Sequence, residues 1–384
     1  MDALTTPLPK AWQKVRLGDI AHVFDGTHQT PQYTHYGVAF FSVENIVSDK
    51  PSKFISQQDY LTATNQNRPE YNDILLTRIG TIGVSKVVNW NYPFSIYVTL
   101  AVIKQSKYFN SYYLHYFIQS NFFQKELKNN SLLQAIPCKI NMNELKKCEV
   151  ILPPLNEQAA IANILSDVDR YLYSLRALIL KKESVKKALS FELLSQRKRL
   201  KGFNQAWQKV RLGDIAEIKR GVRITKNELD VFGKYPVVSG GVGFLGYTNN
   251  FNRYENTITI AQYGTAGYVN FQKNKFWAND ICFCVYHNKD VIKNIFLYYF
   301  LKVNQNYLYE ISNRNATPYS ISKDKILDFE ILLPPLNEQV AIANILSGLD
   351  SEIISLKNKK RQFENVKKAL NHDLMSAKIR VLKE

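Results

Sequence analysis

The stretch LPPLNEQAAIANILSDVD, from Leu152 to Asp169, returns as LPPLNEQVAIANILSGLD from Leu333 to Asp350, with fifteen of eighteen residues identical at a separation of 181 positions. A second stretch, WQKVRLGDIA from Trp12 to Ala21, recurs unchanged from Trp207 to Ala216. The long segments between these stretches show no such match. The chain of 384 residues is therefore an internal duplication in which the flanks of each copy are repeated and the centres have diverged.

The LPPLNEQ motif predicts the start of a long helix in each copy. In the first copy the adjacent prolines exclude earlier helix, Asn156 can cap the first turn, and Glu157 lies where the helix dipole favours a carboxylate. Apolar residues then recur at spacings of mostly three and four until the basic stretch RKRLKG, whose Gly202 can end the helix. This apolar stripe comprises Ile161, Leu165, Val168, Leu172, Leu175, Ile179, Val185, Leu189 and Leu193 in the first copy, and Ile342, Leu346, Leu349, Ile353, Leu356, Phe363, Val366, Leu370 and Leu374 in the second.

The two stripes are expected to pair with each other. A helix of roughly 65 Å cannot bury a narrow apolar stripe alone, and a duplicated unit closes most simply around a two-fold axis, which favours an antiparallel coiled coil. Lys182 matches Phe363, and Lys360 matches Ile179, so each copy has a lysine where the other is apolar. These lysines either fix the register or extend their stems out of the seam.

Residues 22–151 and 217–332 differ in sequence but share one outline. Strands are predicted at VAFFSVENI, YNDILLTRIG, ENTITIAQYG and DICFCVYH, and helices at YYLHYFIQSNFFQKEL and NIFLYYFLKVN. The expected fold class is α+β, with two similar globular domains separated by the two long helices and related by pseudo-two-fold symmetry. The expected divisions are residues 1–151 for the first domain with its framing segment, 152–201 for the first helix, 202–332 for the second domain with its framing segment, and 333–384 for the second helix.

Charge is the first indication of function. Fifty basic residues against thirty-three acidic ones give a net charge of +17, which favours a nucleic-acid partner over a merely soluble basic surface. Because no apolar run is long enough to span a membrane and no signal peptide is recognisable, a cytoplasmic location is expected. The cysteines and histidines form no metal-binding spacing, so neither a metal nor a cofactor is expected. A site built from Cys282, Cys284 and His287 is the alternative to buried structural thiols.

A glycine-rich turn follows a predicted strand in both domains. TRIGTIG, from Thr77 to Gly83, corresponds to AQYGTAG, from Ala261 to Gly267. Such glycines allow a ligand to approach the backbone, but a plain tight turn requires them equally. Arg78 in the first domain stands where Gln262 stands in the second; arginine suits guanine and glutamine suits adenine, so these residues read bases or are exposed strand residues without a role.

Catalytic motifs are not supported. The glycines 241, 243 and 246 match a dinucleotide fingerprint, but the sequence after them is not helical. The stretch NYPF, from Asn91 to Phe94, departs from the adenine methyltransferase motif at Tyr92, and no phosphate-binding loop occurs. The chain is therefore not expected to be an enzyme.

These features resemble the specificity subunit of type I DNA restriction-modification enzymes. The resemblance covers the whole chain and is carried by the doubled LPPLNEQ and WQKVRLGDIA, by DGTHQTPQY (Asp25 to Tyr33), by DILLTRIGTIG and by YPVVSGG followed by GTAG. It implies two target-recognition domains that each read half of an interrupted DNA site, and helices that space them and dock methyltransferase subunits, two in number. It also implies restriction and translocase subunits in the full complex. The alternative is a two-lobed coiled-coil scaffold for protein partners without specific DNA readout.

The resemblance does not identify the residues that contact bases. Basic, polar and aromatic residues of the loops and near the glycine turns are therefore the candidates, namely Thr27, His28, Gln29, Tyr33, Arg68, Arg78, Arg220, Arg223, Lys226, Arg253, Gln262 and Tyr263. The residues expected to form the coiled coil and its docking surface are Ile161, Leu165, Val168, Leu172, Leu175, Leu189, Ile342, Leu346, Leu349, Ile353, Leu356 and Leu370.

Overall fold

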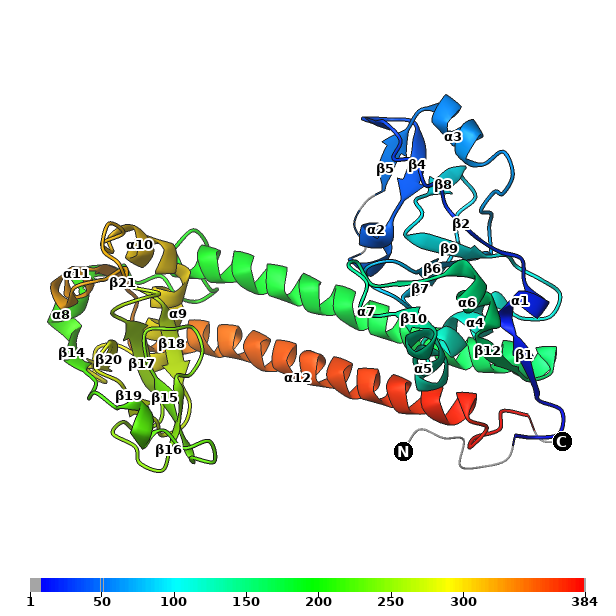
Figure 1. Ribbon diagram of the computed structural model, residues 1–384. Helices are drawn as coiled ribbons and strands as arrows, with labels where there is room; N and C mark the ends of the chain where they lie inside the picture. Colours follow the sequence, from blue (N-terminus) through cyan, green and yellow to red (C-terminus); the bar gives the residue numbers. More distant parts are fainter. Residues whose placement is uncertain (1–7, 49, 51, 383–384) are drawn as a thin grey trace. The chain divides into compact units, whose positions relative to one another are not determined.

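The computed structural model describes residues 8–48, 50 and 52–382, and it divides into two compact units (Figure 1). The first unit comprises residues 1–176 and 359–384, and the second comprises residues 177–358. Each unit therefore contains one β-rich domain, here called a reader, together with part of each of two long helices.

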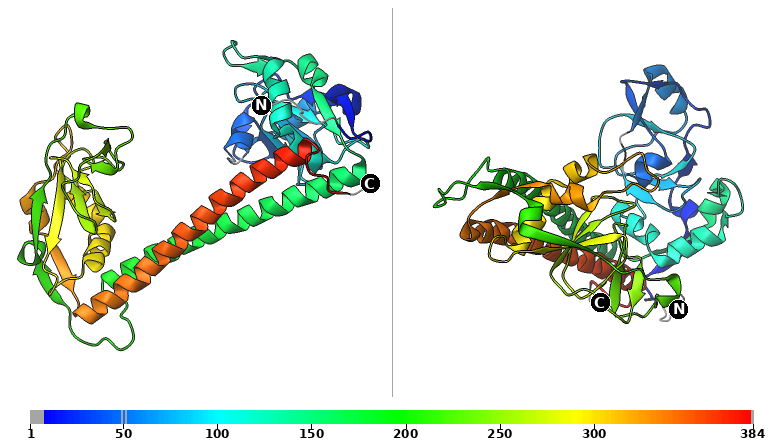
Figure 2. Two further views of the ribbon diagram at one scale, coloured as in Figure 1. Left: turned by 90° about the horizontal axis from the view of Figure 1, so that it is seen from below. Right: turned by 90° about the vertical axis from the view of Figure 1, so that its left-hand side faces the viewer.

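The long helices are α7 (Leu155–Leu194) and α12 (Leu336–Met375), each of 40 residues (Figures 1 and 2). Both begin directly after the paired prolines, as the motif predicts. In the first unit Tyr171 of α7 packs on Phe363 of α12, with ring centroids 4.6 Å apart. In the second unit the ammonium of Lys182 on α7 lies 2.8 Å from Glu352 on α12. Because residue numbers rise along one helix as they fall along the other, the antiparallel pairing is confirmed.

Most of the predicted stripe is buried or half-buried. Ile161, Leu165, Leu172, Leu175, Ile342, Leu346 and Ile353 are buried, and Val168, Leu189, Leu349, Leu356 and Leu370 are half-buried. The equivalent residues Val185 and Val366 were wrongly included, because their side chains are 45% and 52% exposed. The seam follows a spacing of alternately three and four residues, which brings Lys182 and Lys186 inward and leaves Val185 outside.

The two lysines that interrupt the stripe differ in their partners. Lys182 contacts Glu352 on the opposite helix, whereas Lys360 contacts Glu364 on its own helix, at 3.0 Å. Both side chains are about 30% exposed, as expected if the aliphatic stem covers the seam and the ammonium reaches solvent.

The base of each reader is a pair of strands formed by the repeated flanks. β1 (Gln13–Arg16) pairs antiparallel with β12 (Glu149–Leu152), and β13 (Gln208–Arg211) pairs in the same register with β21 (Glu330–Leu333). The short helices α1 (Leu17–Ile20) and α8 (Leu212–Ile215) follow β1 and β13. Because β12 and β21 lead directly into the long helices, the two repeated stretches of each copy lie side by side.

Two small sheets form each reader. In the first reader, one sheet has the order β2 (Val23–Asp25), β9 (Leu100–Ile103), β6 (Ile74–Thr77), β7 (Ser85–Val87), and the other has the order β3 (Tyr33–Thr34), β5 (Lys53–Ile55), β4 (Val38–Phe41), β8 (Phe94–Ile96). In the second reader, the corresponding orders are β14 (Ala216–Arg220), β20 (Cys282–His287), β17 (Thr257–Ala261), β18 (Val269–Gln272) and β16 (Gly246–Thr248), β15 (Tyr235–Val238), β19 (Trp277–Ala278). The first sheets share one strand order, and the second sheets match except that β3 has no counterpart in the second reader, so both readers have one α+β fold.

Each predicted strand stretch contains a strand, but the end of VAFFSVENI is helical. The remaining elements of the first reader are α2 (Val43–Val47), α3 (Gln57–Ala63), α4 (Ser111–Ile118), α5 (Asn121–Asn129), β10 (Ser131–Leu132), β11 (Lys139–Ile140) and α6 (Met142–Lys147). Those of the second are the 3₁₀ helix η1 (Lys226–Glu228), α9 (Asn294–Val303), α10 (Gln305–Glu310) and α11 (Lys323–Leu327). Ser120 breaks the first predicted helical run, because its hydroxyl caps α5 by accepting from the backbone N–H of Phe123.

The reader and the helix pair share one hydrophobic core in each unit. In the first unit Leu114 of α4, Ile161 of α7 and Leu374 of α12 belong to the same buried cluster. In the second unit Leu297 of α9, Leu193 of α7 and Leu346 of α12 do so. Each reader is thus packed on both helices rather than tethered to one of them.

Candidate nucleic-acid interface

The glycine turns are tight turns with the same geometry in both readers. Gly80 and Gly83 have φ angles of +81° and +93°, and Gly264 and Gly267 have φ angles of +78° and +88°. These conformations favour glycine. The N–H of Gly83 donates to the carbonyl of Thr77 at 2.9 Å, and the N–H of Gly267 makes the equivalent bond at 2.9 Å. The turn alone therefore accounts for the glycines, without a ligand.

Arg78 is buried and is bonded to protein acceptors. Its side chain lies in the first reader with only 7% of its surface exposed. Nη1 donates to Asp25 Oδ2 at 3.0 Å and to the carbonyl of Val98 at 2.9 Å, and Nε donates to the carbonyl of Ile140 at 3.2 Å. Burial lowers the pKa of Arg78, and the carboxylate of Asp25 opposes that shift. The base-reading role stays a prediction, and it now requires these bonds to be exchanged for bonds to DNA.

Gln262 occupies the equivalent place in the second reader with the opposite polarity. Its Oε1 accepts from Nε and Nη2 of Arg220 at 2.8 and 2.6 Å. Arg220 and Asp25 each stand four residues after the repeated WQKVRLGDIA, so the contact between the first strand and the glycine turn is kept. The arginine has moved from the glycine turn to the first strand, and a neutral glutamine takes the place of the aspartate as its acceptor. The sequence contained this signal, because the repeated WQKVRLGDIA aligns Asp25 with Arg220 and the glycine turns align Arg78 with Gln262.

The candidates near the start of the first reader surround Asp25. Nε2 of His28 lies 3.1 Å from the carboxylate oxygen that binds Arg78. The N–H of Gln29 donates to the hydroxyl of Thr27 at 3.3 Å, and both His28 and Gln29 are exposed. The structure therefore brings together Arg78 and His28 through one carboxylate. Tyr33 lies on β3, exposed and with the ammonium of Lys53 4.5 Å from its ring centroid.

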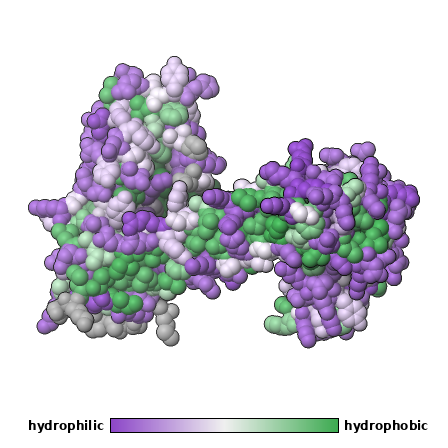
Figure 3. Space-filling view, turned by 180° about the vertical axis from the view of Figure 1, so that it is seen from behind, coloured by the Kyte–Doolittle hydropathy of each residue, from purple (hydrophilic) through white to green (hydrophobic). Residues whose placement is uncertain are grey.

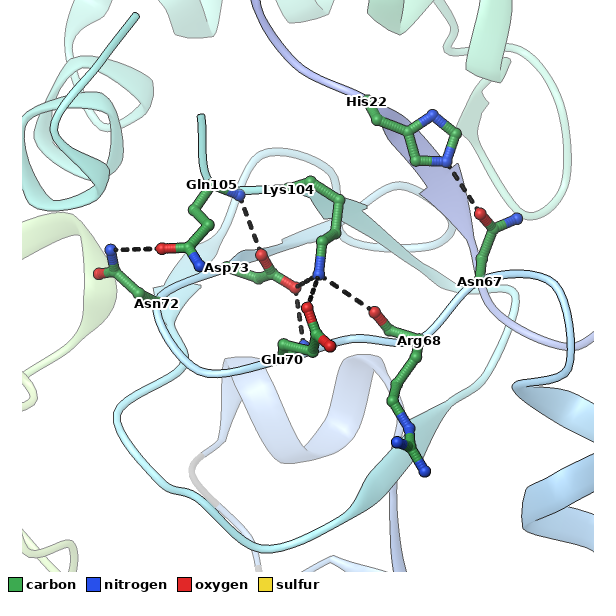
Figure 4. Close-up of polar contacts among 8 residues, drawn as sticks. All are labelled: His22, Asn67, Arg68, Glu70, Asn72, Asp73, Lys104 and Gln105. Carbon is green, nitrogen blue, oxygen red and sulfur yellow. Dashed lines mark hydrogen bonds and ion pairs between the residues drawn. The ribbon is translucent and has the colours of Figure 1, made fainter. Parts of the chain in front are cut away.

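Arg68 lies in a loop that the ammonium of Lys104 and two carboxylates hold in place (Figure 4). The ammonium of Lys104 is 2.6 Å from Glu70 and 2.9 Å from Asp73, and it donates to the carbonyl of Arg68 at 3.3 Å. Burial lowers the pKa of Lys104, but the two carboxylates outweigh burial and raise it overall. The side chain of Arg68 points away from this cluster and lies over the ring of Tyr60, at 5.3 Å.

The candidates of the second reader comprise one hydrogen-bonded group, two exposed cations and a tyrosine that lines a cavity. Arg253 donates through Nη2 to the carbonyl of Arg220 at 2.7 Å, so Arg253, Arg220 and Gln262 are linked. Arg223 and Lys226 are exposed. Tyr263, which is half-buried, lines an open cavity of about 600 Å³ together with Gly240, Thr265 and Pro318.

A tryptophan, a glutamate and an arginine meet at the base of each reader, and we call this group the clamp. In the first unit Glu157 accepts from Nε1 of Trp12 at 3.0 Å and from Nε of Arg380 at 2.7 Å. In the second unit Glu338 accepts from Nε1 of Trp207 at 3.0 Å and from Nη2 of Arg199 at 2.6 Å. The two glutamates are 2% and 0% exposed.

The clamp explains why WQKVRLGDIA and LPPLNEQ are repeated together. The tryptophan of one stretch binds the glutamate of the other, and the arginine comes from the segment that follows the opposite long helix. The sequence interpretation of Glu157 as a residue that merely favours the helix dipole missed this contact. The sequence feature that could have indicated this contact is that the tryptophan and the glutamate are both present in each copy of the repeat.

The glutamine of LPPLNEQ joins the long helix to the reader. Oε1 of Gln158 accepts from the backbone N–H of Asn110 at 2.8 Å, and its Nε2 donates to the carbonyl of Pro153 at 2.8 Å. Gln339 accepts from the N–H of Lys293 at 2.7 Å and makes the same return bond to Pro334. In each unit the first turn of the long helix is thus bonded to the start of helix α4 or α9.

Two classes of site find no support in the part of the chain that the structure describes. No helix there is long and apolar enough to cross a membrane. Within the same residues, no group of three or more His, Cys, Asp or Glu side chains is placed to hold a metal ion. Cys282 and Cys284 are buried in β20.

Comparisons with known proteins agree on one family. The family described as "Type I restriction modification DNA specificity domain" matches residues 9–183 and 204–365. The putative type I restriction enzyme MjaX specificity subunit of Methanocaldococcus jannaschii is 27% identical over 97% of this chain and 95% of its own length. The putative type I specificity subunit S.MpnORF638P of Mycoplasma pneumoniae is 32% identical over 39% of this chain and 40% of its own.

Solved structures agree with the sequence matches. The crystal structure of the type I restriction-modification S subunit from M. genitalium has the same fold, with a TM-score of 0.70, 18% identity, and coverage of 97% of this chain and 99% of that one. The HsdS subunit from Thermoanaerobacter tengcongensis has a TM-score of 0.50 at 16% identity. With both repeats matched by the family model, the chain belongs to the type I restriction modification DNA specificity family and is the non-catalytic DNA specificity subunit of such a system.

Proposed function

We propose that each reader binds one half of an interrupted DNA site, and that the long helices dock the methyltransferase subunits of the complex. The observation that carries this proposal is the contact between the first strand and the glycine turn. It pairs Asp25 with Arg78 in one reader and Arg220 with Gln262 in the other. The two readers share one fold but have different polar side chains at this contact. Such a difference is suited to readers that recognise different DNA sequences.

Exposed cations of each reader are suited to hold phosphates. Arg68 in the first reader, and Arg223 and Lys226 in the second, are exposed and lie apart from the buried pairs. Phosphate contacts fix the register of a protein on DNA, and side chains in the major groove then read base edges. We assign base contacts to the loops around Asp25 and Arg220. The proposed location is the cytoplasm, where the DNA is found.

Exposed apolar side chains on the long helices are the proposed docking surface for methyltransferase subunits. Tyr173 and Leu180 of α7 are 76% and 64% exposed, and Ile354 of α12 is 48% exposed. Apolar side chains interrupt the hydrophilic surface over the long helices in Figure 3. Because the helix is duplicated, two methyltransferase subunits are expected, with restriction and translocase subunits added in the full complex.

Exchange of residues 22–151 for the matching segment of another family member tests the two-reader proposal. One half of the methylated site is expected to change and the other half to stay the same, because the segment begins and ends directly beside the repeated stretches, whose strands pair with each other. Methylome sequencing of cells that also express the methyltransferase subunit gives the result. The reciprocal exchange of residues 217–332 is the control and is expected to change the other half. A change in both halves from a single exchange would contradict independent readers.

Replacement of Arg78 by alanine is expected to relax a preference for guanine in the half-site of the first reader, at a cost of about 1–3 kcal/mol in binding. The same change leaves Asp25 without its buried donor, so a loss of stability is expected as well. Binding to a panel of single-base variants measures the first effect, and thermal unfolding measures the second. Gln262→Ala is the matched control, which should alter only the other half-site. Equal weakening on every duplex would assign Arg78 to a structural role.

A fragment of residues 1–201 is expected to form a two-fold dimer that, together with the methyltransferase subunit, directs methylation to an interrupted palindrome of the first half-site. The seam residues match closely between copies, and in the dimer Arg199 of one copy can bind Glu157 of the other, as Arg380 does in the full chain. Lys182 then meets Tyr171 instead of Glu352, which weakens the dimer. Mass in solution and methylome sequencing are the measurements. A folded monomer that methylates no palindrome would show that the copies are no longer interchangeable.

A further inference from the structure

A tyrosine of the first reader is bonded to both long helices. Tyr116 lies on α4 with its residue only 3% exposed, and its hydroxyl donates to Oδ2 of Asp169 on α7 at 2.8 Å. The other oxygen of Asp169 is 2.7 Å from the ammonium of Lys367 on α12. That ammonium also lies 5.3 Å from the centroid of the Tyr116 ring. We call this tyrosine, aspartate and lysine a triad.

The second unit contains the same triad with the helices exchanged. Tyr299 of α9, which is 5% exposed, donates to Oδ2 of Asp350 on α12 at 2.6 Å. Lys186 of α7 is 2.5 Å from Oδ1 of Asp350 and 5.5 Å from the centroid of the Tyr299 ring. Asp350 and Lys367 follow Asp169 and Lys186 by 181 positions. The triad is therefore present in both units, although the tyrosines come from the segments whose sequences have diverged.

The chemistry of the triad makes a directed contact. Burial and the neighbouring aspartate raise the pKa of both tyrosines, so each hydroxyl stays protonated and donates. The aspartate accepts hydrogen bonds from the tyrosine and from the lysine of the other helix. The ammonium of that lysine also makes a cation–π contact with the tyrosine ring. A hydrophobic contact alone is not directional, so it would hold the reader on the helices without fixing the orientation of the reader.

The triad is the second of two points at which polar bonds join α4 to the helix pair, beside the shared core and the clamp. The first point is the bond between Gln158 and the backbone of Asn110, at the start of α4. Tyr116 lies six residues further along α4, or about 9 Å, and Asp169 lies eleven residues further along α7, or about 16 Å. Two separated points fix an axis, so α4 cannot pivot on α7 while both hold.

We propose that Tyr116 and Tyr299 are positioning residues that fix the orientation of each reader on the helix pair, and thereby set which length of unread DNA the protein accepts. The inference rests on the proposed function, in which the two readers bind separate half-sites. One base pair changes the position of a half-site by about 3.4 Å along the duplex and by about a tenth of a turn around it. A reader free to pivot by a similar amount would accept spacers that a fixed reader rejects.

The test uses the full chain with Tyr116→Phe and Tyr299→Phe combined, which keeps both rings and removes both hydroxyls. Binding is measured on duplexes with the native spacer and with spacers one base pair shorter and longer. The wild type is expected to prefer the native spacer, and the double variant to lose about tenfold of that preference, which corresponds to one hydrogen bond to a charged group. Preferences for single bases within each half-site are expected to stay unchanged.

The matched control removes a duplicated ion pair that touches no residue of the triad. Arg176 pairs with Glu364 at 3.3 Å, and Lys357 pairs with Glu183 at 2.6 Å, on the exposed side of the helix pair. Glu183→Gln combined with Glu364→Gln is expected to keep the full spacer preference. An equal loss in this control would attribute the effect to the helix pair and overturn the proposal.

Two further results are decisive. Full spacer preference in a folded Tyr→Phe double variant overturns the positioning role while leaving the two readers in place. A wild-type protein that binds all spacers equally overturns the proposed function together with the inference. If the Tyr→Phe variant fails to fold, Lys186→Met with Lys367→Met removes the lysines instead, and the same spacer measurement decides.

Discussion

Replacing Leu172 or Ile353 by glutamate is expected to abolish methylation while leaving weak DNA binding by each reader. The two residues are equivalent in the repeat, and their side chains are 5% and 6% exposed in the seam between α7 and α12. A carboxylate placed there has no partner, and burying it costs several kcal/mol. Neither residue belongs to the buried clusters that the readers share with the helices, so the damage is expected in the pairing of the helices, while each reader keeps its own core.

The control for this prediction is Ala177→Glu, which places the same charge on an exposed position of α7. Thermal unfolding is expected to show a large loss of stability for the seam variants and a small change for the control. A pull-down with the methyltransferase subunit reports assembly. Normal assembly and normal activity in the seam variants would show that the helices do not pair through these residues.

Replacing Glu338 by alanine is expected to destabilise the second unit by about 3–5 kcal/mol, the cost of breaking one side of a buried ion pair. Glu338 is fully buried, and its removal leaves the guanidinium of Arg199 and the indole N–H of Trp207 without their acceptor. Glu157→Ala is expected to have a similar effect in the first unit, where Trp12 and Arg380 lose theirs.

Glu330→Ala provides the comparison for the clamp. Glu330 contacts Lys209 at 2.6 Å, but both side chains are about 60% exposed, so their loss is expected to change stability little. Denaturant unfolding followed by protease protection assigns each loss to a unit. A Glu338→Ala variant no less stable than Glu330→Ala would mean that the clamp contributes no more than a surface ion pair.

The duplication, the long helices and their antiparallel pairing could be predicted, because helical periodicity is visible over forty residues. The position of the seam was less certain. Val185 was assigned to it by its apolar side chain, whereas Lys182 and Lys186 occupy that part of the seam with their stems. A pattern of residue types does not reveal where a lysine folds its stem along an apolar surface.

The candidate site was harder to predict, because its contacts join residues far apart in the chain. From its sequence context, Arg78 is predicted to be an exposed strand residue or a residue that contacts bases, because arginines are seldom buried. Its burial depends on Asp25, 53 positions earlier, and on two backbone carbonyls that no sequence pattern marks. The shared α+β outline of the readers was predictable from their strands and helices. That Asp25 and Arg220 contact the glycine turns depends on the order of the strands, which the sequence does not reveal.

The strand pairs β1–β12 and β13–β21 have a consequence for how such a protein changes over generations. Because each pair closes the base of a reader, the chain enters and leaves the reader at adjacent points in the same register. A genetic crossover within either repeated stretch would therefore rejoin two different genes where their backbones coincide. Such a recombinant would carry a complete reader on an intact base, and even the transfer of a reader from the first position to the second would preserve the hydrogen bonds of the join. New recognition sequences can then arise in one event, without a period of instability between the parental and recombinant proteins.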